Sequence, residues 1–171
     1  LKRKSPIPPE DILKQGVAVK LKVNVDFHER YGLKLIIEDI DSSFTMGQLE
    51  MQRQAILKAI QERGLIRKNA ETHLPVVVQR LAVISSDRAA GYKDFIKHLE
   101  DNFYGYDIRI DLFEAAMQGQ QVENEISACL DKVEKTMSDY DAVAIIRGGG
   151  GRTDLAAFDN LNLAVRIARF P

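Results

Sequence analysis

The sequence predicts an α/β fold in which a three-stranded, parallel, Rossmann-like sheet of βαβαβα order follows a linker helix and an antiparallel β-hairpin. The main observation is that apolar-rich strand segments at residues 81–85, 108–113 and 142–146 each precede a segment with apolar residues at helical spacing. Strands that alternate with helices form parallel sheets with right-handed crossovers. The second observation is that large apolar residues take every second position over 17–27, which is typical of a half-buried strand.

This alternation predicts the N-terminal hairpin. Valine, leucine or phenylalanine takes every second position from 17 to 27, and Leu33, Leu35 and Ile37 repeat the pattern after a turn at residues 28–32. Two such segments around a glycine-containing turn form an antiparallel hairpin with one wet face. We therefore assign residues 1–43 to a tail and a hairpin.

A helix is predicted next. Thr45 and Gln48 have the spacing of a capping box, and Leu49, Ile56 and Ile60 mark one helical face. Gly64 is expected to end the helix, and residues 64–79 read as a connection. Residues 44–79 are thus a linker segment, and residues 80–171 form the N-terminal part of the α/β domain.

The strand order follows from the pattern of charge. The strand at 108–113 has Arg109 and Asp111 between its apolar residues, so one of its faces should be wet, as at a sheet edge. The other two strands are apolar throughout. This predicts the order 2-1-3, with strand 81–85 in the centre and helices on both faces. The loops after residues 85 and 146 should then face each other at the topological switch point, where open α/β sheets bind ligands.

Composition and charge narrow the class of protein. The 171 residues are 45% hydrophobic and 29% charged, as in one ordinary globular domain with a small appendage. The net charge of −1 argues against a dedicated duplex-DNA binder. No apolar stretch approaches the ~18 residues of a membrane span, and a single cysteine, Cys129, fits a reducing cytoplasm. The three histidines have no ligand spacing, so no zinc site is predicted.

The segment Arg-Gly-Gly-Gly-Gly-Arg-Thr-Asp at residues 147–154 follows an apolar run. Glycines permit positive φ and close approach of another molecule, and an arginine can hold a phosphate with two parallel N–H bonds. We therefore predict an anion cradle, with a tight turn that binds nothing as the alternative. No Gly-Lys-Ser/Thr follows, so this is no P-loop. The predicted cradle consists of Arg147, Gly148, Gly149, Gly150 and Gly151.

Four further residues are candidates for the site. Ser85 and Ser86 follow the central strand and would either contact the anion or cap the next helix. Asp94 lies in that helix, where it could orient a water molecule, bind a divalent ion or act as a base; the alternative is a solvated helix residue. Asp154 is either a ligand contact or an acid in the first turn of its helix.

In order and spacing, these residues resemble the large subunit of exodeoxyribonuclease VII, a bacterial exonuclease specific for single-stranded DNA, over about residues 17–171. Residues 81–86 resemble its first catalytic strand, and Met117-Gln118-Gly119 resembles its Val-Gln-Gly turn. Residues 147–158 resemble its motif Arg-Gly-Gly-Gly-Ser-x-Glu-Asp-Leu-x-Ala-Phe. The hairpin resembles the end of its N-terminal OB-fold, and residues 49–65 resemble its linking helix.

The resemblance implies hydrolysis of phosphodiester bonds in single-stranded DNA with release of oligonucleotides. It implies catalytic roles for Asp94 and Arg147, and substrate contacts for the serines, the glycines and Asp154. A divalent cation such as Mg²⁺ is a candidate cofactor, with no metal ligand assigned. The implied partners are single-stranded DNA and a small helical subunit that binds further downstream. In the hairpin, the resemblance implies that the DNA strand is contacted by Lys20, Lys22, His28 and Arg30. The alternative is that these side chains only form a solvated strand face.

The chain also departs from the family pattern. Residues 85–91 read Ser-Ser-Asp-Arg-Ala-Ala-Gly, where the family has Thr-Ser-Pro-Thr-Gly-Ala-Ala. The loop after the first strand therefore gains two charged residues, and its glycine moves from position 89 to position 91. Gly151 and Thr153 replace a serine and a glutamate. The family's next strand ends in Gly-His-Glu-x-Asp, which lies beyond these residues, so we expect this stretch alone to be inactive. A non-catalytic nucleotide- or phosphate-binding α/β domain, and a structural module without ligand, remain the alternative functions.

Overall fold

The computed structural model describes residues 12–13, 17–149 and 155–171. The chain divides into two compact units, Leu1–Ala55 and Ile56–Pro171. The expected three-part division at residues 43 and 79 stays a prediction. Within the described ranges, no helix combines the length and the apolar character that crossing a membrane requires.

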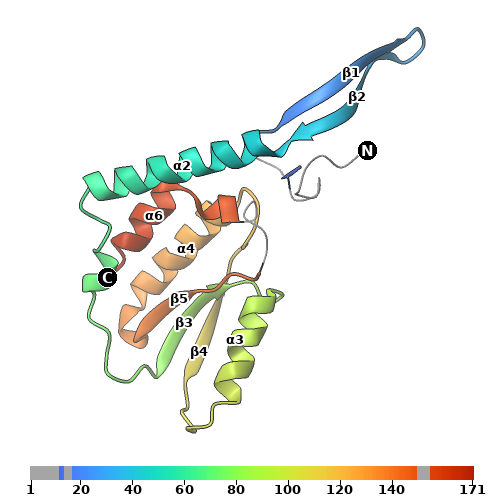
Figure 1. Ribbon diagram of the computed structural model, residues 1–171. Coiled ribbons are helices and arrows are strands. Elements are labelled where there is room, and N and C mark those ends of the chain that lie inside the picture. Colours follow the sequence, from blue (N-terminus) through green and yellow to red (C-terminus); the bar gives the residue numbers. More distant parts are fainter. Residues whose placement is uncertain (1–11, 14–16, 150–154) are drawn as a thin grey trace. The chain divides into compact units, whose positions relative to one another are not determined.

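The first unit contains the predicted hairpin. Strands β1 (Lys20–His28) and β2 (Gly32–Asp41) pair antiparallel, with His28 opposite Gly32 (Figure 1). The Tyr31 amide donates to the His28 carbonyl at 3.1 Å, and Gly32 has a φ of +74°. A turn followed by a left-handed glycine matches the twist of the two strands. The hairpin is confirmed, but its apolar face is not buried, since Phe27 and Leu33 are 69% and 67% exposed.

Helix α2 (Ser42–Glu62) is the predicted linking helix, with a different start. The Asp41 carboxylate accepts from the Phe44 amide at 3.1 Å, so Asp41 caps the helix. That hydrogen bond, and then Lys20, lower the pKa of Asp41. The capping box at Thr45 is wrong: Thr45 is buried, and its hydroxyl donates to the Ala18 carbonyl at 3.1 Å. The strand simply continues until Asp41, which supplies an earlier cap.

The end of α2 is confirmed at Gly64. This glycine has a φ of +65°, its amide donates to the Gln61 carbonyl at 2.9 Å, and the Leu65 amide donates to the Ile60 carbonyl at 3.0 Å. The pair of bonds is a Schellman motif. Ile60 and Leu65 occupy the two positions whose apolar contact usually accompanies this helix end, and both are buried.

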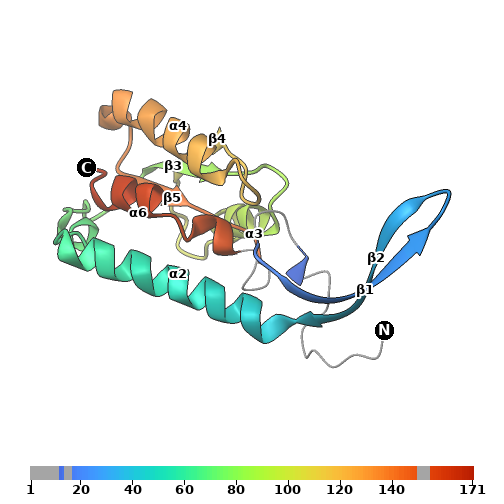
Figure 2. The same cartoon turned by 90° about the horizontal axis from the view of Figure 1, so that it is seen from above.

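The second unit holds the predicted parallel sheet. Its order is β4-β3-β5, with β3 pairing in parallel to both neighbours (Figures 1 and 2). The predicted order 2-1-3 is therefore confirmed. Short 3₁₀ helices occur at Asn69–Glu71, Met137–Asp139 and Ala156–Phe158. The main elements are β3 (Arg80–Ser85), α3 (Ala90–Glu100), β4 (Arg109–Glu114), α4 (Val122–Lys135), β5 (Ala142–Ile145) and α6 (Leu161–Ala168).

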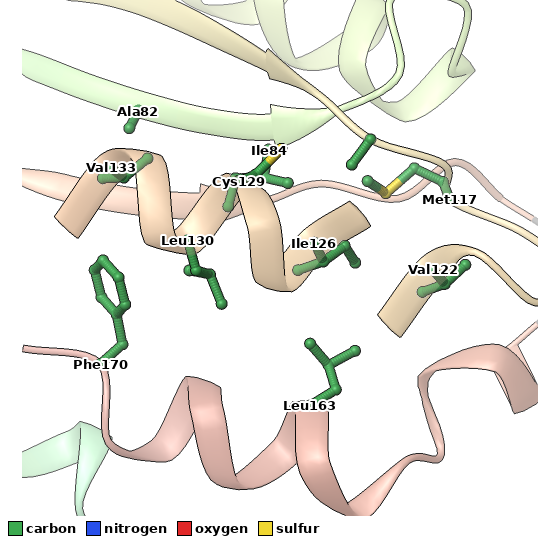
Figure 3. Packing of buried hydrophobic residues seen from close by; sticks show 11 residues of the cluster. Ala82, Ile84, Met117, Val122, Ile126, Cys129, Leu130, Val133, Leu163 and Phe170 are labelled. Carbon is green, nitrogen blue, oxygen red and sulfur yellow. The ribbon is translucent and has the colours of Figure 1, made fainter. Parts of the chain in front are cut away.

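The core lies between the sheet and α4, and α6 packs against α4. Figure 1 shows α3 on the other side of the sheet from α4 and α6. In Figure 3, Ala82 and Ile84 of β3 lie on one side of α4, while Leu163 and Phe170 approach from the other. Cys129 belongs to this core, and burial raises the pKa of its thiol. The buried face of α4 consists of Val122, Ile126, Cys129, Leu130 and Val133.

Polar contacts fix α6 against α4. The Glu123 carboxylate accepts from the side-chain amides of Asn160 at 2.6 Å and Asn162 at 2.9 Å. Asn160 also caps α6 by accepting from the Leu163 amide at 3.0 Å. Arg166 donates to Asp131 at 2.8 Å and to Glu134. These contacts hold the start and the last turn of α6 against α4.

At the amino ends of the strands, Asp141 joins β5 to β3. Its carboxylate accepts from the amides of Gln79 and Arg80, both at 2.8 Å, and its own amide donates to the Arg80 carbonyl at 2.8 Å. The amide of Gln79, then that of Arg80, lower the pKa of the Asp141 carboxyl. The charged form of Asp141 is thus part of the folded structure.

We predict that Ile126→Ala lowers the free energy of unfolding by about 2–5 kcal/mol, because it empties a fully buried site beneath the sheet. Ile66→Ala is the matched control, since Ile66 is 57% exposed. Urea unfolding followed by circular dichroism measures both. Equal losses for the two variants would contradict the assignment of α4 to the core.

We predict that Asp141 contributes stability at neutral pH that is lost in acid. Its folded pKa lies below the usual 3.8, so the contribution is present above that value and disappears as the pH falls through the folded pKa. Asp141→Asn should lower the melting temperature at pH 7, and the difference from the unchanged protein should shrink below about pH 4. Asp107→Asn, the same change at an exposed position, is the control. A difference that grows in acid would contradict this account.

Candidate functional site

A pocket of about 420 Å³ lies where the three parallel strands end. Its walls come from Ser86 and residues 88–90 after β3, residues 116–118 after β4, and residues 147–149 after β5. We call it the strand-end pocket. The two loops that the sequence placed opposite each other do meet here. The carboxyl edge of a parallel sheet is also where such folds bind ligands.

Arg147 enters this pocket directly from β5. The preceding residue, Ile146, donates its amide to the Ile84 carbonyl at 3.0 Å, so the sheet pairing continues to the last residue before Arg147. The Nε and Nη2 atoms of Arg147 are shielded from solvent. A cation at the edge of the sheet, partly withdrawn from water, interacts more strongly with an anion than an exposed one does.

The two candidate serines have different roles. Ser85 is completely buried, and its hydroxyl donates to the Ile146 carbonyl at 2.6 Å. Its own carbonyl accepts from the Ala115 amide at 2.9 Å. Ser85 therefore joins the chain segments that leave β4 and β5, and it does not line the pocket. Ser86 does line it.

Helix α3 begins at the pocket wall. Its capping position is Ala89, whose side chain makes no capping hydrogen bond. Neither serine is the N-cap, so the capping alternative is wrong. Ala89 and Ala90 line the pocket, which brings the amide end of a helix, and its partial positive charge, to the same wall as Arg147.

Asp94 lies one turn further along α3 and is exposed. It is not among the described residues that line the strand-end pocket. Its backbone carbonyl lies 2.7 Å from Nδ1 of His98, so that nitrogen carries the proton and donates. The catalytic assignment of Asp94 stays a prediction.

The glycine loop is described up to residue 149. Gly148 and Gly149 line the pocket, but neither has a positive φ. The expectation that these glycines adopt a left-handed backbone conformation with positive φ is therefore wrong at both positions. Gly150, Gly151 and Asp154 lie outside the described residues, and their assignment stays a prediction.

Sequence reasoning missed two parts of the site. The first is the wall after β4, where the Ala116 amide donates to the Glu125 carboxylate at 2.7 Å and Gln118 lines the pocket. The signal for it was the position of Met117-Gln118-Gly119 at a strand end, where Gly119 has a φ of +84°. The second is Gly91, which packs against Arg147. The sequence signal for this residue was the glycine of the first loop, which stands at position 89 in the family pattern and at position 91 in this chain.

A second pocket, also of about 420 Å³, is mainly apolar. Val143 and Ile145 of β5, Leu130 of α4 and Ile167 of α6 contribute to its walls, and Arg147 lines this pocket too. Arg147 is thus a common wall residue of both pockets. The strand-end pocket is the polar one, with two arginines and no carboxylate among its described residues.

Two lysines of the hairpin have carboxylate partners. Lys22 forms an ion pair with Glu38 at 2.8 Å, and Lys20 with Asp41 at 3.3 Å. The hydrogen bond to Glu38 raises the pKa of Lys22. His28 accepts from the Arg30 amide at 3.2 Å. These contacts favour the solvated strand face over a DNA-binding stripe.

The candidate metal ion has no preformed cluster of ligands in the described residues. The part of the chain that the structure describes contains no group of three or more histidine, cysteine, aspartate or glutamate side chains arranged to hold an ion. The described walls of the strand-end pocket offer arginine, hydroxyl, side-chain amide and backbone N–H groups.

The adjacent serines give a matched test. We predict that Ser85→Ala lowers the free energy of unfolding by about 1–3 kcal/mol, because it leaves the Ile146 carbonyl without its buried donor. Ser86→Ala should leave stability nearly unchanged and weaken binding of phosphate to the pocket. Thermal unfolding and titration with inorganic phosphate measure the two effects. Equal stabilities for the two variants would contradict the role of Ser85.

The chain matches the family model described as exonuclease VII, large subunit, over residues 65–171. It is 29% identical over 161 residues to the exodeoxyribonuclease 7 large subunit of Deinococcus radiodurans, an alignment that covers 93% of this chain and 39% of that protein. The protein of the same name from Campylobacter hominis is 29% identical over 156 residues, which cover 91% of this chain and 39% of the relative. The chain thus spans about two fifths of the length of these relatives. With a matched family model over most of its residues, the chain belongs to the exonuclease VII large-subunit family.

Proposed function

We propose that this chain is part of a nuclease subunit that hydrolyses phosphodiester bonds of single-stranded DNA and releases oligonucleotides. In this proposal, the strand-end pocket binds a backbone phosphate. The observation that carries it is the local charge of the pocket: Arg88 and Arg147 line its walls with no described carboxylate, in a chain whose net charge is −1. Membership of the exonuclease VII large-subunit family supports the proposed reaction class.

The donors in the pocket suit a phosphate. Arg147 supplies a planar set of N–H groups that matches two phosphate oxygens. The first turn of α3 supplies backbone amides and the positive end of a helix dipole. Ser86 and Gln118 add a hydroxyl and a side-chain amide. Arg88 is 91% exposed and lies 3.9 Å from Asp87, a weak ion pair that a phosphate can replace.

In phosphodiester hydrolysis, negative charge grows on the phosphoryl oxygens as water attacks phosphorus and the ester oxygen leaves. A fixed guanidinium lowers the energy of that charge without reorganisation of solvent. Arg147 is the residue to which we assign this role, because Ile146 anchors it to the sheet on one side. We assign no step to a metal ion.

Asp94 is proposed as the carboxylate that positions water or a divalent ion. It is carried by α3, the helix that begins at the pocket wall. Its support is the family resemblance, since its side chain is exposed and outside the described walls. Single-stranded DNA and the small subunit of the nuclease are the proposed partners, and the catalytic His and Asp of the family motif are proposed to come from the region beyond residue 171.

The binding step has a direct test. We predict that Arg147→Ala weakens binding of a fluorescein-labelled oligo(dT) by roughly tenfold or more, because a charged hydrogen bond contributes about 1.5–3 kcal/mol. The slope of log K against log salt should also fall by about one. Arg67→Ala, at an exposed arginine in the connection before β3, is the matched control. Fluorescence anisotropy at several salt concentrations measures both, and equal affinities would contradict the proposed site.

The catalytic step needs a separate test. We predict that the 171-residue chain does not degrade labelled single-stranded DNA, whereas the parent protein extended by about 30 residues does. In the longer protein, Asp94→Asn and Arg147→Ala should each lower the cleavage rate by about 10²–10⁴-fold, the usual effect of losing one acid–base or electrostatic group. Unchanged cleavage in the Asp94→Asn protein would remove that residue from the mechanism. An active 171-residue chain would overturn the expected inactivity.

A further inference from the structure

The first turn of α3 lies against the backbone of Arg147, and the contact is made at Gly91. A Cβ atom built on Gly91 would lie 2.5 Å from the Arg147 carbonyl oxygen, 3.1 Å from its carbonyl carbon and 3.2 Å from Cα of Gly148. The first of these distances is far inside the contact distance of carbon and oxygen. The atoms are backbone atoms, so no side-chain rotation relieves the clash. Only glycine fits this position without movement of one segment.

In this contact between α3 and the glycine loop, only the glycine of the helix lacks room for a side chain. A Cβ on Gly148 would lie 3.6 Å from the Ala90 nitrogen and 3.8 Å from the Gly91 nitrogen, which are ordinary contact distances. Gly149 has open space around it. The glycine that lets the two segments approach is therefore the one in the helix and not one in the described part of the glycine loop. Gly91 does not have a positive φ, so backbone conformation alone does not require glycine there.

The position of Arg147 is limited from two directions. On the strand side, Ser85 holds the Ile146 carbonyl at 2.6 Å, and the Ile84 carbonyl holds the Ile146 amide at 3.0 Å. On the helix side, the Arg147 carbonyl rests on Gly91. A methyl group at residue 91 must therefore displace Arg147 and Gly148, or tilt the start of α3. Either movement changes the strand-end pocket, which Arg147, Gly148 and Ala90 line.

We propose that Gly91 is a positioning residue that sets the distance between Arg147 and the amide end of α3, and so makes them one phosphate clamp. The ligand in this proposal rests on the proposed function. The steric role of Gly91 does not rest on the proposed function, since it concerns only the contact between the Arg147 backbone and helix α3. Displacement of a binding group by about 1 Å can cost on the order of 100-fold in enzymes, so a single methyl group is sufficient to impair the site.

The test compares Gly91→Ala with Gly47→Ala. Gly47 lies in α2, is exposed and has nothing within 4 Å of the position that an added methyl group would take; the control therefore adds the same methyl group in a helix, away from the site. Gly91→Ala should weaken oligo(dT) binding at least about tenfold, and Gly47→Ala should leave the affinity within about twofold. In an Arg147→Ala background, Gly91→Ala should have almost no further effect, since coupled residues are not additive. Full additivity, or unchanged affinity, would overturn the positioning role.

A second measurement separates this proposal from the proposed function. In ¹H–¹⁵N spectra, Gly91→Ala should shift the Gly148 amide and the Arg147 Nε–H signals, while Gly47→Ala leaves both in place. If the unchanged protein does not bind oligo(dT) but these shifts occur, the function fails and the steric role stands. If both signals stay in place in folded Gly91→Ala protein, the positioning role is overturned whatever the binding result.

Discussion

The hydrogen bonds of Ser85 are the constraint on which the site depends. This residue ends the central strand, and it holds both neighbouring chain segments: its carbonyl accepts from Ala115 after β4, and its hydroxyl donates to the Ile146 carbonyl after β5. Because Ser85 is fully buried, these bonds do not compete with water. They bring the exits of three strands to one edge, and everything that lines the strand-end pocket follows within a few residues of that edge.

From this edge the chain builds a positive pocket in a slightly acidic protein. One strand delivers Arg147, the loop after β3 delivers Ser86 and Arg88, and the turn after β4 delivers Gln118. Gly91 lets the backbone of Arg147 touch the first turn of α3, so the arginine and the helix amides act at the same place. Further away, Glu123 and Asn160 fix the start of α6. The proposed phosphate site is thus the meeting point of three short segments on a rigid sheet.

The sequence was sufficient for the sheet and insufficient for the details of the pocket, and both outcomes have physical reasons. Charge alternation at Arg109 and Asp111 marked an edge strand, and that was enough to predict the order β4-β3-β5. The capping box at Thr45 was misassigned because the spacing of two residues cannot reveal that the strand runs on to Asp41. Ser85 was assigned to the site because a serine at a strand end can either contact a ligand or hydrogen-bond to neighbouring backbone. Only its burial in the structure distinguishes these two roles. Gly91 was not recognised, because the shift of the glycine from position 89 to 91 does not reveal which backbone segment lies against it.

The central claim is that phosphate binds where Arg147 meets the start of α3. The most direct measurement is a ¹H–¹⁵N titration of the protein with the dinucleotide pdTpdT, following the amides of residues 88–90, 116–118 and 147–149 together with the arginine Nε–H signals. The account predicts saturable shifts that are largest at these residues and that disappear at high salt, because the contact is electrostatic. Saturable shifts confined to the β1–β2 hairpin, with the signals of the strand-end pocket unchanged, would contradict it.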